Sequence, residues 1–395
     1  MRNLQSAKEK CVPLKIDFNN DIEENKDFLR SKIKDQTILI IGAAGSIGSQ
    51  YVKCILLYEP KRLVAVDVNE NGLAELTRDL RSSALLGDTE YISYPVNLLS
   101  GTFEKIWHKH DYNIVANFSA HKHVRSEKDV ISVEALMLNN IFGAIKLLKL
   151  CMLKPPSYFF SVSTDKAANP VNIMGASKSL MEKIILSKSK DLNVRTARFA
   201  NVAFSNGSLL DGFVHRIRKN QPLSCPIDIK RFFVSEQQAG QICLLSTFLG
   251  DSGNVFFPKL SFQDDQIYFK DIGINFLKNL GFEPFICHTE VEARAFDIKK
   301  NSDKYPLFLF KTDTSGEKKY EEFYTNQDLL DLERHESLGI IIKNYEDINQ
   351  DILEQELVLL VEDINTKKED YVRFLKKYIS DFEHIEKGKH LDDKM

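Results

Sequence analysis

The sequence predicts an α/β fold built on a doubly wound parallel sheet, and three observations lead to this prediction. Short apolar runs alternate with helix-like segments between residues 37 and 202 of the 395, as expected for strands joined by crossover helices. A glycine-rich turn separates the first apolar run, residues 37–41, from the helical segment after it. Polar residues follow the ends of successive predicted strands, which would collect them along one edge of the sheet.

Each element is predicted from its local pattern of apolar residues. The predicted strands of the sheet are 37–41, 62–67, 90–95, 112–120, 158–162 and 194–202, with helices at 49–57, 103–110, 132–151 and from 175 onward. After residue 205 the alternation breaks, and the pattern predicts a strand at 254–260, a helix at 272–280, a turn and helix start at 314–323, and helices at 353–364 and 371–379.

These elements divide the chain into four predicted parts. They are an N-terminal helical extension (1–35), a Rossmann domain (36–203), a smaller lobe from which some segments return to the sheet (204–330), and a C-terminal helical extension (331–395). The N-terminal part is predicted either to dock as a leading helix near 21–34 or to form a flexible tail, and residues 384–395 are expected to be frayed.

Composition excludes several classes of function. The chain is 43% hydrophobic and 28% charged, with net charge −3, so neither nucleic acid nor an anionic membrane is expected as a partner. Six cysteines without a Cys-x-x-Cys pair suggest a reduced, cytoplasmic protein rather than a disulfide framework. No apolar run reaches bilayer length, and the polar N-terminus does not resemble a signal peptide, so no membrane span is predicted.

The glycine turn after the first strand predicts a dinucleotide site. Gly42, Gly45 and Gly48 allow a tight turn, a close approach to a pyrophosphate and close packing of helix on strand. The phosphates would lie at the helix N-terminus, against Ser46 and Ile47.

The second predicted strand supports this reading and indicates which cofactor binds. The strand at 62–67 ends in Asp67, which would accept a hydrogen bond from the ribose 2′-hydroxyl and repel a 2′-phosphate. NAD is therefore predicted as the cofactor in preference to NADP.

The stretch from 162 to 178 predicts a second cluster of polar residues. Thr164, Asp165 and Lys166 follow the apolar run at 158–162, so a hydroxyl, a carboxylate and an amine would meet at one strand end. This combination is typical of acid–base catalysis, although a surface loop would also carry such residues.

Two further segments are candidates for ligand contact. His121 and His123 flank Lys122 after the strand at 112–120, but metal sites normally need three protein ligands, so a loop beside cofactor or substrate is favoured. A basic, glycine-containing region between 204 and 233 contains Arg231, whose guanidinium suits a phosphorylated ligand, unless the region is simply a solvated surface.

With these motifs in view, the chain resembles the extended short-chain dehydrogenase/reductases over residues 35–325. Within them it is most similar to the nucleotide-sugar 4,6-dehydratases of bacterial polysaccharide biosynthesis, especially the UDP-N-acetylglucosamine 4,6-dehydratases. The resemblance rests on Ser-Thr-Asp-Lys at 163–166, Met-Gly-Ala-Ser-Lys at 174–178, His-Lys-His-Val at 121–124, Arg-Phe-Ala-Asn-Val at 198–202, Ser205, Gly-Ser at 207–208, Lys-Arg-Phe-Phe at 230–233 and Gly-Glu-Lys at 316–318. The chain departs from the usual pattern at Met174 (commonly tyrosine in the superfamily), Ala200 (glycine), Asn97 (aspartate) and residues 314–315 (Arg-Pro).

The resemblance implies a role for each matching position. Catalysis would involve Thr164, Asp165, Lys166, Met174 and Lys178. NAD would contact Gly42, Gly45, Ser46, Ile47, Gly48, Asp67, Asn97, Ser119, Ala120, Asn140 and Lys178. A UDP-linked N-acetylhexosamine would contact Lys122, His123, Asn201, Ser205, Ser208, Arg231 and Glu317. No metal is implied, and a homo-oligomer is expected.

The implied reaction is a 4,6-dehydration. Hydride leaves C4 of the sugar for NAD, Lys166 with a lowered pKa removes the C5 proton, and protonated Asp165 donates to the leaving C6 hydroxyl. Hydride then returns to C6, giving a 4-keto-6-deoxy sugar. Thr164 would hold the C4 oxygen and Lys178 the nicotinamide ribose. The thioether of Met174 cannot take a proton, so Asp165 or a water must accept the one from the C4 hydroxyl.

Two alternatives remain at this point. A nucleotide-sugar 4-epimerase on the same scaffold would return hydride to C4, and it would not need an Asp-Lys pair at C5 and C6. A non-catalytic dinucleotide sensor is compatible with Met174, although such a protein has little use for the triplet at 164–166.

Overall fold

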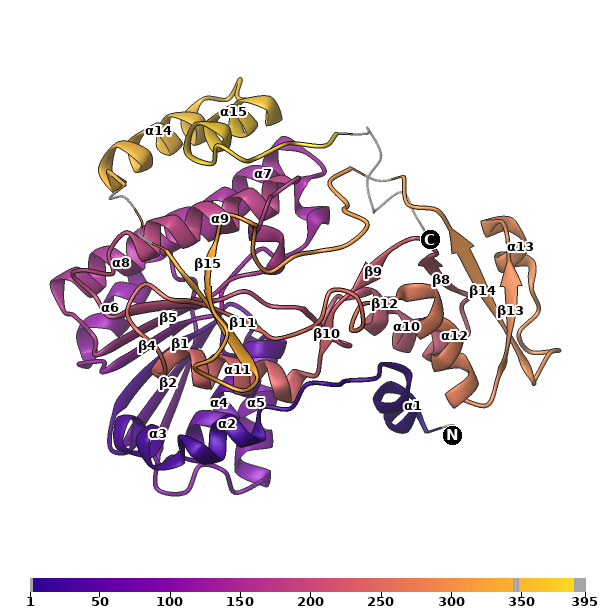
Figure 1. Cartoon of the computed structure of the whole chain (residues 1–395), viewed down its shortest axis with the longest axis horizontal. Coiled ribbons are helices and arrows are strands. Elements are labelled where there is room, and N and C mark those ends of the chain that lie inside the picture. The colour runs from indigo at the N-terminus through magenta and orange to yellow at the C-terminus, as the bar shows by residue number, and fades with distance from the viewer. Residues whose placement is uncertain (1–2, 314, 344, 346–347, 387–395) are drawn as a thin grey trace.

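A nine-stranded, mainly parallel sheet flanked by helices forms the centre of the molecule (Figure 1). The computed structural model describes residues 3–313, 315–343, 345 and 348–386. The strand order is β15-β16-β11-β6-β5-β4-β1-β2-β3. Strand β16 pairs antiparallel with both β11 and β15, and the other adjacent strands pair in parallel. The predicted doubly wound α/β class is confirmed.

The nine strands of the large sheet agree with the sequence prediction in seven cases; those at 329–331 and 338–342 were not predicted, and the second lies in the extension (331–395) expected to be helical. In chain order they are β1 (Thr37–Ile41), β2 (Arg62–Asp67), β3 (Glu90–Pro95), β4 (Ile114–Asn117), β5 (Tyr158–Val162), β6 (Val194–Ala197), β11 (Val255–Pro258), β15 (Leu329–Asp331) and β16 (Leu338–Ile342). The central strands β1, β4, β5 and β6 are buried on both faces, which is why they form continuous apolar runs rather than alternating ones.

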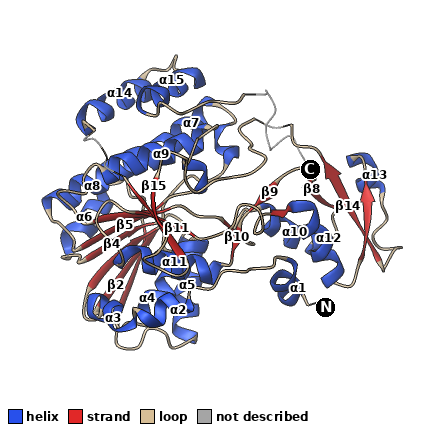
Figure 2. Cartoon of the chain, in the orientation of Figure 1, coloured by secondary structure: helices blue, strands red, loops and turns tan. Residues whose placement is uncertain are grey.

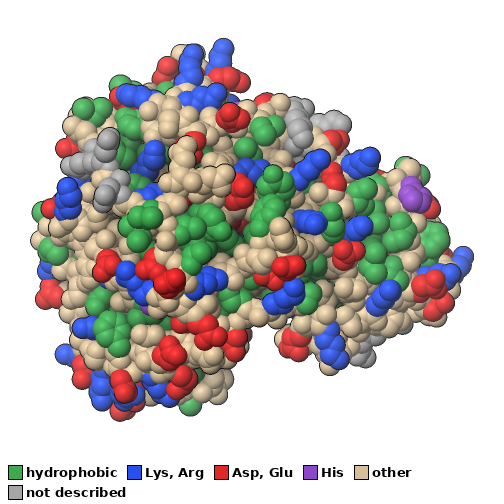
Figure 3. Space-filling view, viewed as in Figure 1, with side chains coloured by type: hydrophobic (Ala, Val, Ile, Leu, Met, Phe, Trp, Pro, Cys, Tyr) green, Lys and Arg blue, Asp and Glu red, His purple; other side chains and the backbone are tan. Residues whose placement is uncertain are grey.

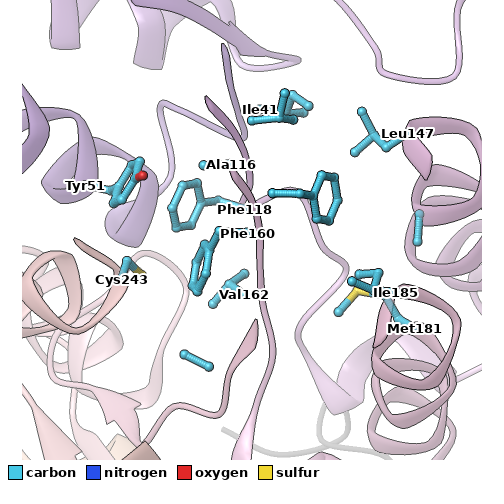
Figure 4. Packing of buried hydrophobic residues seen from close by; sticks show 14 of the residues in the cluster. Ile41, Tyr51, Ala116, Phe118, Leu147, Phe160, Val162, Met181, Ile185 and Cys243 are labelled. Carbon is cyan, nitrogen blue, oxygen red and sulfur yellow. The ribbon is translucent and has the colours of Figure 1, made fainter. Parts of the chain in front are cut away.

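Helices cover both faces of this sheet (Figure 2). They are α4 (Ser46–Leu56), α5 (Glu70–Ser82), α6 (Gly101–Lys109), α7 (Val130–Met137), α8 (Gly143–Leu153), α9 (Ile173–Leu186) and α11 (Glu236–Phe248). Figure 4 shows Phe118 and Phe160 between Tyr51 and Cys243 on one side and Leu147 and Met181 on the other. The sheet therefore lies inside one continuous hydrophobic core.

The predicted helix at 132–151 is a longer helical stretch interrupted by a π-helical turn. The turn, Leu138–Phe142, joins α7 to α8 and contains Asn140. Among the described residues this stretch, Val130–Leu153, is the one helix long and apolar enough to cross a membrane, with 61% of its apolar window buried inside the protein. A buried core helix meets the same criteria of length and composition, and α8 packs against α9 in this core.

The smaller lobe contains a three-stranded parallel sheet, β13-β14-β8, packed against helices. Its elements are α10 (Leu209–Arg218), β8 (Leu223–Pro226), α12 (Phe269–Asn279), β13 (Glu283–Cys287), α13 (Glu290–Ala295) and β14 (Lys304–Phe310). Two short strand pairs, β7 (Asn201–Val202) with β10 (Phe233–Val234) and β9 (Lys230–Arg231) with β12 (Ile267–Tyr268), lie between this lobe and the large sheet.

The N-terminal extension is docked, so the flexible-tail prediction is wrong. Helix α1 (Leu4–Cys11) packs on α12 of the smaller lobe, whereas α2 (Asn19–Glu24) and α3 (Lys26–Ile33) pack on the large domain. The segment thus joins the two parts of the molecule along one side (Figure 1).

The C-terminal extension covers the opposite face of the large domain. Helices α14 (Gln350–Glu362) and α15 (Lys368–Tyr378) pair with each other, and α15 packs on α7 and α9. The expectation of fraying is wrong for residues 384–386, because the amide of Ile385 donates to the Val171 carbonyl and its own carbonyl accepts from Gly316. Residues 387–395 lie outside the described part. The helix start predicted at 314–323 is also wrong for residues 315–323, which form turns and extended chain.

Candidate active site

The predicted ligand-binding residues meet at the carboxyl edge of the large sheet. The register pairs Ile41 of β1 with Val66 of β2 and with Asn117 of β4, and Asn117 with Ser161 of β5. The segments that follow these strands carry the glycine loop, Asp67, Ser119 and the 164–166 triplet, so adjacent strand ends deliver all of them to one place.

Two glycines of the loop have the close approaches that the sequence predicted. Gly42 has φ +75°, and a Cβ built on it would lie 2.6 Å from the amide nitrogen of Ser119. A Cβ on Gly48 would lie 2.1 Å from the carbonyl oxygen of Gly42. Neither position can accept a larger residue without moving the backbone beside it.

Gly45 differs from these two, because the turn itself does not require a glycine at this position. Its φ is −72°, a value open to any residue, and a Cβ on it would lie 3.4 Å from the Gly42 carbonyl oxygen, an ordinary contact. The amide of Gly45 donates to the same oxygen at 3.3 Å and closes the turn. The protein's own packing therefore does not demand glycine here, and a ligand lying against the loop is the remaining physical reason for it.

The start of helix α4 supplies the donors for such a ligand. The helix begins at Ser46 with Gly45 as its N-cap, and no side chain among the described residues caps this end with a hydrogen bond. The first amides, including that of Ile47, are thus left to face a ligand phosphate. These residues fit a dinucleotide pyrophosphate.

Replacing Gly48 with alanine should impair NAD binding. The new methyl group would displace the Gly42 carbonyl, and overpacking of this kind costs about 1–3 kcal/mol, on the order of a tenfold or larger loss of affinity. Gly101→Ala is a matched control, because a Cβ on Gly101 meets nothing within 4 Å. NAD titration monitored by thermal shift measures both variants, and equal affinity in the two would contradict the assignment of the loop.

Asp67 is held against the same loop. Its two carboxylate oxygens accept from the backbone amides of Ala44 and Asn69, each at 2.9 Å. The remaining lone pairs of a carboxylate fixed in this way suit ribose hydroxyls. Asn97, after β3, accepts from the amide of Leu99 at 2.8 Å and shapes the adjacent turn.

The loop containing Ser119 and Ala120 is positioned by two asparagines. The side-chain oxygen of Asn117 accepts from the Ser119 hydroxyl at 2.7 Å. Buried Asn140 accepts from the amide of His121 at 2.9 Å and donates to the carbonyl of the same residue at 3.1 Å. Asn140 therefore holds the loop in the structure, a role that the sequence prediction of cofactor contact did not include.

The triplet after β5 forms a compact acid–base cluster around a buried aspartate. Asp165 is buried, and its Oδ1 accepts from the Thr164 hydroxyl and from the Lys166 ammonium, both at 2.9 Å. Its Oδ2 has no hydrogen-bond partner among the described residues. Gly175 lies so close to this turn that a Cβ would meet the Lys166 carbonyl at 2.5 Å, which explains the glycine at this position.

Lys166 also faces a carboxylate that the sequence did not reveal. Its Nζ lies 3.6 Å from Oε1 of Glu321, and the same oxygen lies 3.5 Å from Nη2 of Arg231. Burial is the largest influence on the pKa of Lys166 and lowers it, but the charges of Asp165 and Glu321 together raise it above its usual value. The expectation that Lys166 has a lowered pKa is therefore wrong for this arrangement.

Two core interactions bring Glu321 to the cluster. The ring of Phe323 stacks on Phe232 and Phe257, with centroids 5.0 and 5.9 Å apart. Buried Arg198 donates through Nη1 to the Phe323 carbonyl at 2.8 Å and binds Glu182 of α9 with its other nitrogens. Segment 315–323 is thus tied to the large domain immediately beside Glu321.

Met174 and Lys178 lie on the buried face of α9. Met174 is 1% exposed and belongs to the main hydrophobic cluster. The Nζ of Lys178 donates to the Val162 carbonyl at 2.7 Å, and burial lowers the pKa of this lysine to about 8, against the opposing effect of Glu182. Lys178 thus sits directly under the strand end that carries the triplet.

The residues predicted to contact substrate are divided between several elements. Ser208 caps α10, and Asn201 donates to the Phe232 carbonyl at 3.4 Å. Ser205 is buried, and the amide that follows it, that of Asn206, donates to the Ser46 hydroxyl at 2.9 Å, which links this loop to the start of α4.

Arg231 lies next to the Lys166 cluster and also faces Glu317. The Nη1 of Arg231 donates to the Lys230 carbonyl at 2.8 Å, and its Nη2 faces Glu317 at 3.9 Å in addition to Glu321. The guanidinium is therefore already held by protein groups. Within the described residues, no group of three or more histidine, cysteine, aspartate or glutamate side chains could hold a metal ion.

The loop after β4 carries Lys122, which lies near Glu236 and Asp211, and His123, which lies against Gly207. Burial lowers the pKa of Lys122, while Glu236 and Asp211 act in the opposite direction. The His123 ring lies against Gly207, where a Cβ would approach Nε2 to 3.2 Å. On the face shown in Figure 3, positively and negatively charged side chains are interspersed.

Comparison with known proteins identifies a family and agrees with the fold. A family model described as "Polysaccharide biosynthesis protein" matches residues 38–343. An uncharacterized membrane protein of Methanocaldococcus jannaschii, MJ1061, is 29% identical over 78% of this chain and 86% of its own. The capsular polysaccharide biosynthesis protein CapD of Staphylococcus aureus is 25% identical over 77% of this chain, which spans half of CapD. A UDP-glucose 4-epimerase of Rickettsia bellii is 28% identical over 57% of this chain and 66% of its own.

Solved structures share the fold at lower sequence identity. Pen from Bacillus thuringiensis superposes with a TM-score of 0.64 at 20% identity, covering 83% of this chain and 98% of Pen. The UDP-glucuronic acid 4-epimerase of Bacillus cereus, solved with UDP-glucuronic acid and NAD, superposes with a TM-score of 0.55 at 18% identity, covering 72% of this chain and 89% of the epimerase. Both likenesses concern the fold.

Proposed function

The chain belongs to the polysaccharide biosynthesis protein family, and on this basis we propose that it is an NAD-dependent 4,6-dehydratase of a UDP-linked N-acetylhexosamine, with UDP-N-acetylglucosamine as the first candidate. The observation that carries the proposal is the cluster of Thr164 and Lys166 around buried Asp165 at the end of β5, at the same edge of the sheet as the dinucleotide loop. A cytoplasmic location and a homo-oligomeric state remain predictions.

The cofactor part of the proposal rests on the fit of the glycine loop and Asp67. Close backbone packing at Gly42 and Gly48 fixes the turn, and the uncapped start of α4 would leave its first amides for a pyrophosphate. The fixed carboxylate of Asp67 suits an unphosphorylated ribose. Bound NAD would supply a hydride acceptor for C4 and then the hydride donor for C6. Lys178 lies under the adjacent strand end, where its amine would meet the nicotinamide ribose.

The arrangement of the cluster alters the proton transfers expected from sequence. Asp165 accepts two hydrogen bonds and pairs with an ammonium, so it would begin the cycle as a carboxylate and not as the protonated acid. In this order Asp165 takes the proton of the C4 hydroxyl and later gives it to the departing C6 hydroxyl. Lys166 must first release one proton from its ammonium; the neutral amine then takes the C5 proton, returns it to C5 when hydride reaches C6, and regains the proton that it released. The sum of these transfers is the loss of one water.

This order also removes the difficulty raised by Met174. A thioether accepts no proton, and Met174 is buried in the hydrophobic core. Asp165 would perform both proton transfers on the hydroxyl groups, so no tyrosine is required.

A nucleotide-sugar 4-epimerase is the second candidate. The similarity to UDP-glucose 4-epimerases favours it, since one of them is 28% identical over 57% of this chain. An epimerase requires no proton transfer at C5, however, so Lys166 would have no role in its chemistry. This is why the dehydratase is preferred.

Mass spectrometry of the sugar nucleotide distinguishes the two. The protein is incubated with NAD and UDP-N-acetylglucosamine, and the expected product has lost one water without net accumulation of reduced cofactor. A product of unchanged mass with the C4 configuration inverted would establish the epimerase instead. If neither UDP- nor GDP-linked N-acetylhexosamines lose water, the dehydratase proposal is wrong.

A further inference from the structure

Glu321 is a buried acid that the proposed reaction, as described so far, does not use. Its side chain is 3% exposed, and its Oε1 lies 3.6 Å from the Lys166 amine and 3.5 Å from the Arg231 guanidinium. Both distances exceed the 2.7–2.9 Å of a charge-assisted hydrogen bond. Its Oε2 has no hydrogen-bond partner among the described residues.

Two other buried acids in the same molecule, Glu182 and Asp21, have both carboxylate oxygens hydrogen-bonded. Glu182 receives three hydrogen bonds from Arg198 at 2.8 to 3.3 Å, which engage both of its oxygens. Asp21 accepts from the backbone amides of Glu336 and Ser337 at 2.9 and 2.8 Å, one on each oxygen. A buried carboxylate that serves structure needs this degree of satisfaction. Glu321 lacks it, although it lies against the central amine of the proposed acid–base site.

From this geometry we propose that Glu321 is a positioning residue that stores the proton of Lys166 during turnover. The inference rests on the proposed function, in which Lys166 acts as the base at C5. Transfer breaks one N–H bond of the ammonium and forms one O–H bond on the carboxylate, which leaves a neutral amine and a neutral acid. The electron pair stays on nitrogen, and the reverse transfer at the end of the cycle restores the ion pair.

The surroundings make this exchange feasible. Burial, the largest influence, raises the pKa of Glu321, and the charge of Asp165 acts in the same direction. Lys166, Arg231 and Lys318 lower it, and the net direction is upward. The pKa of Lys166 is raised as well, so this amine needs a local acceptor to become a base near neutral pH. Transfer inside the pair leaves the net charge of the buried cluster unchanged, which avoids moving a charge out of a poorly solvated site.

The rate profile with pH tests the proposal. In the wild-type protein kcat should fall at low pH as the carboxyl of Glu321 becomes protonated, because a protonated carboxyl can no longer accept the proton of Lys166. This fall is the acid limb of the profile. In Glu321→Gln, Lys166 can release its proton only to solvent, so the acid limb should move to higher pH. At neutral pH kcat should fall on the order of 10²-fold, a typical contribution of one proton transfer, and it should recover in alkaline buffer. KM and NAD content should be unchanged.

Two variants provide the controls. Glu321→Asp keeps a carboxylate and should retain the wild-type acid limb with part of the lost rate. Glu322→Gln makes the same chemical change at the adjacent residue, which contacts Asn169 at 3.3 Å and not Lys166, and should behave as wild type. An acid limb in Glu321→Gln at the wild-type position would overturn the inference.

A measurement independent of turnover separates this inference from the proposed function. The side-chain NMR signal of Lys166, assigned by its loss in Lys166→Met, should titrate in two coupled steps in the wild type and in one step in Glu321→Gln. Identical titrations of Lys166 in the wild type and in Glu321→Gln would contradict the inference, even if water loss is observed. Two steps in a protein that dehydrates no nucleotide sugar would instead refute the proposed function alone.

Discussion

Replacing Lys166 with methionine is expected to stop turnover while NAD remains bound. The substitution keeps a side chain of similar length and removes the amine that the proposal requires at C5. General acid–base groups contribute about 10²–10⁴-fold to rates, so kcat should fall by at least about 10²-fold. Because oxidation at C4 precedes the C5 step, Lys166→Met should accumulate reduced cofactor when substrate is added, which absorbance detects in a single turnover.

Replacing Asp165 with asparagine should give a different time course of cofactor absorbance. Asp165→Asn lacks the carboxylate proposed to take the C4 hydroxyl proton, so little reduced cofactor should form even though turnover is also lost. Lys319→Met is a suitable control, since Lys319 lies in the same segment as Glu321 but is exposed. Full activity in Lys166→Met or Asp165→Asn would refute the assigned roles, and identical traces would refute the order of steps.

Replacing Arg198 with methionine is expected to cause the largest loss of stability. Arg198 is 3% exposed and carries the hydrogen bonds that satisfy both oxygens of Glu182. Burial alone would lower its pKa, but the charge of Glu182 and their shared hydrogen bonds raise it above the usual value. Breaking a buried pair leaves an unpaired charge, which costs about 3–5 kcal/mol. Urea unfolding followed by circular dichroism measures this free energy.

Two comparisons make the stability result specific. Arg294→Met breaks an exposed ion pair with Glu290, and such pairs contribute about 0–1 kcal/mol. The double variant Arg198→Met/Glu182→Leu removes both charges and should regain part of the lost stability. If Arg198→Met unfolds at the wild-type urea concentration, the buried pair does not stabilise this fold as argued.

Arg198→Met also connects stability to the site. Because Arg198 donates to the carbonyl of Phe323, its loss should loosen the segment that carries Glu321. The structure therefore predicts that this core variant shifts the acid limb of kcat, although the hydrogen bonds of Arg198 go to Glu182 and Phe323 and not to Lys166.

The sheet and half of the site could be predicted because their signals are local. Apolar runs gave β1, β2 and β5 with the bounds that the structure has, since strands buried on both faces need continuous apolar residues. Asp67 and the 164–166 triplet followed directly, because strand ends of a parallel sheet share one edge. The helix start expected at 314–323 failed because that segment is held by tertiary contacts rather than by a periodic apolar face.

The sequence by itself determined the doubly wound fold, the dinucleotide loop and the presence of a hydroxyl, a carboxylate and an amine at the end of β5. Only the tertiary structure decided how these groups are charged. Phe323, stacked on Phe232 and Phe257, brings Glu321 to Lys166 from a distant part of the chain. A second buried carboxylate raises the pKa of that lysine. Protonation depends on every charge within a few ångströms, and no local pattern records which distant residues fold into that space.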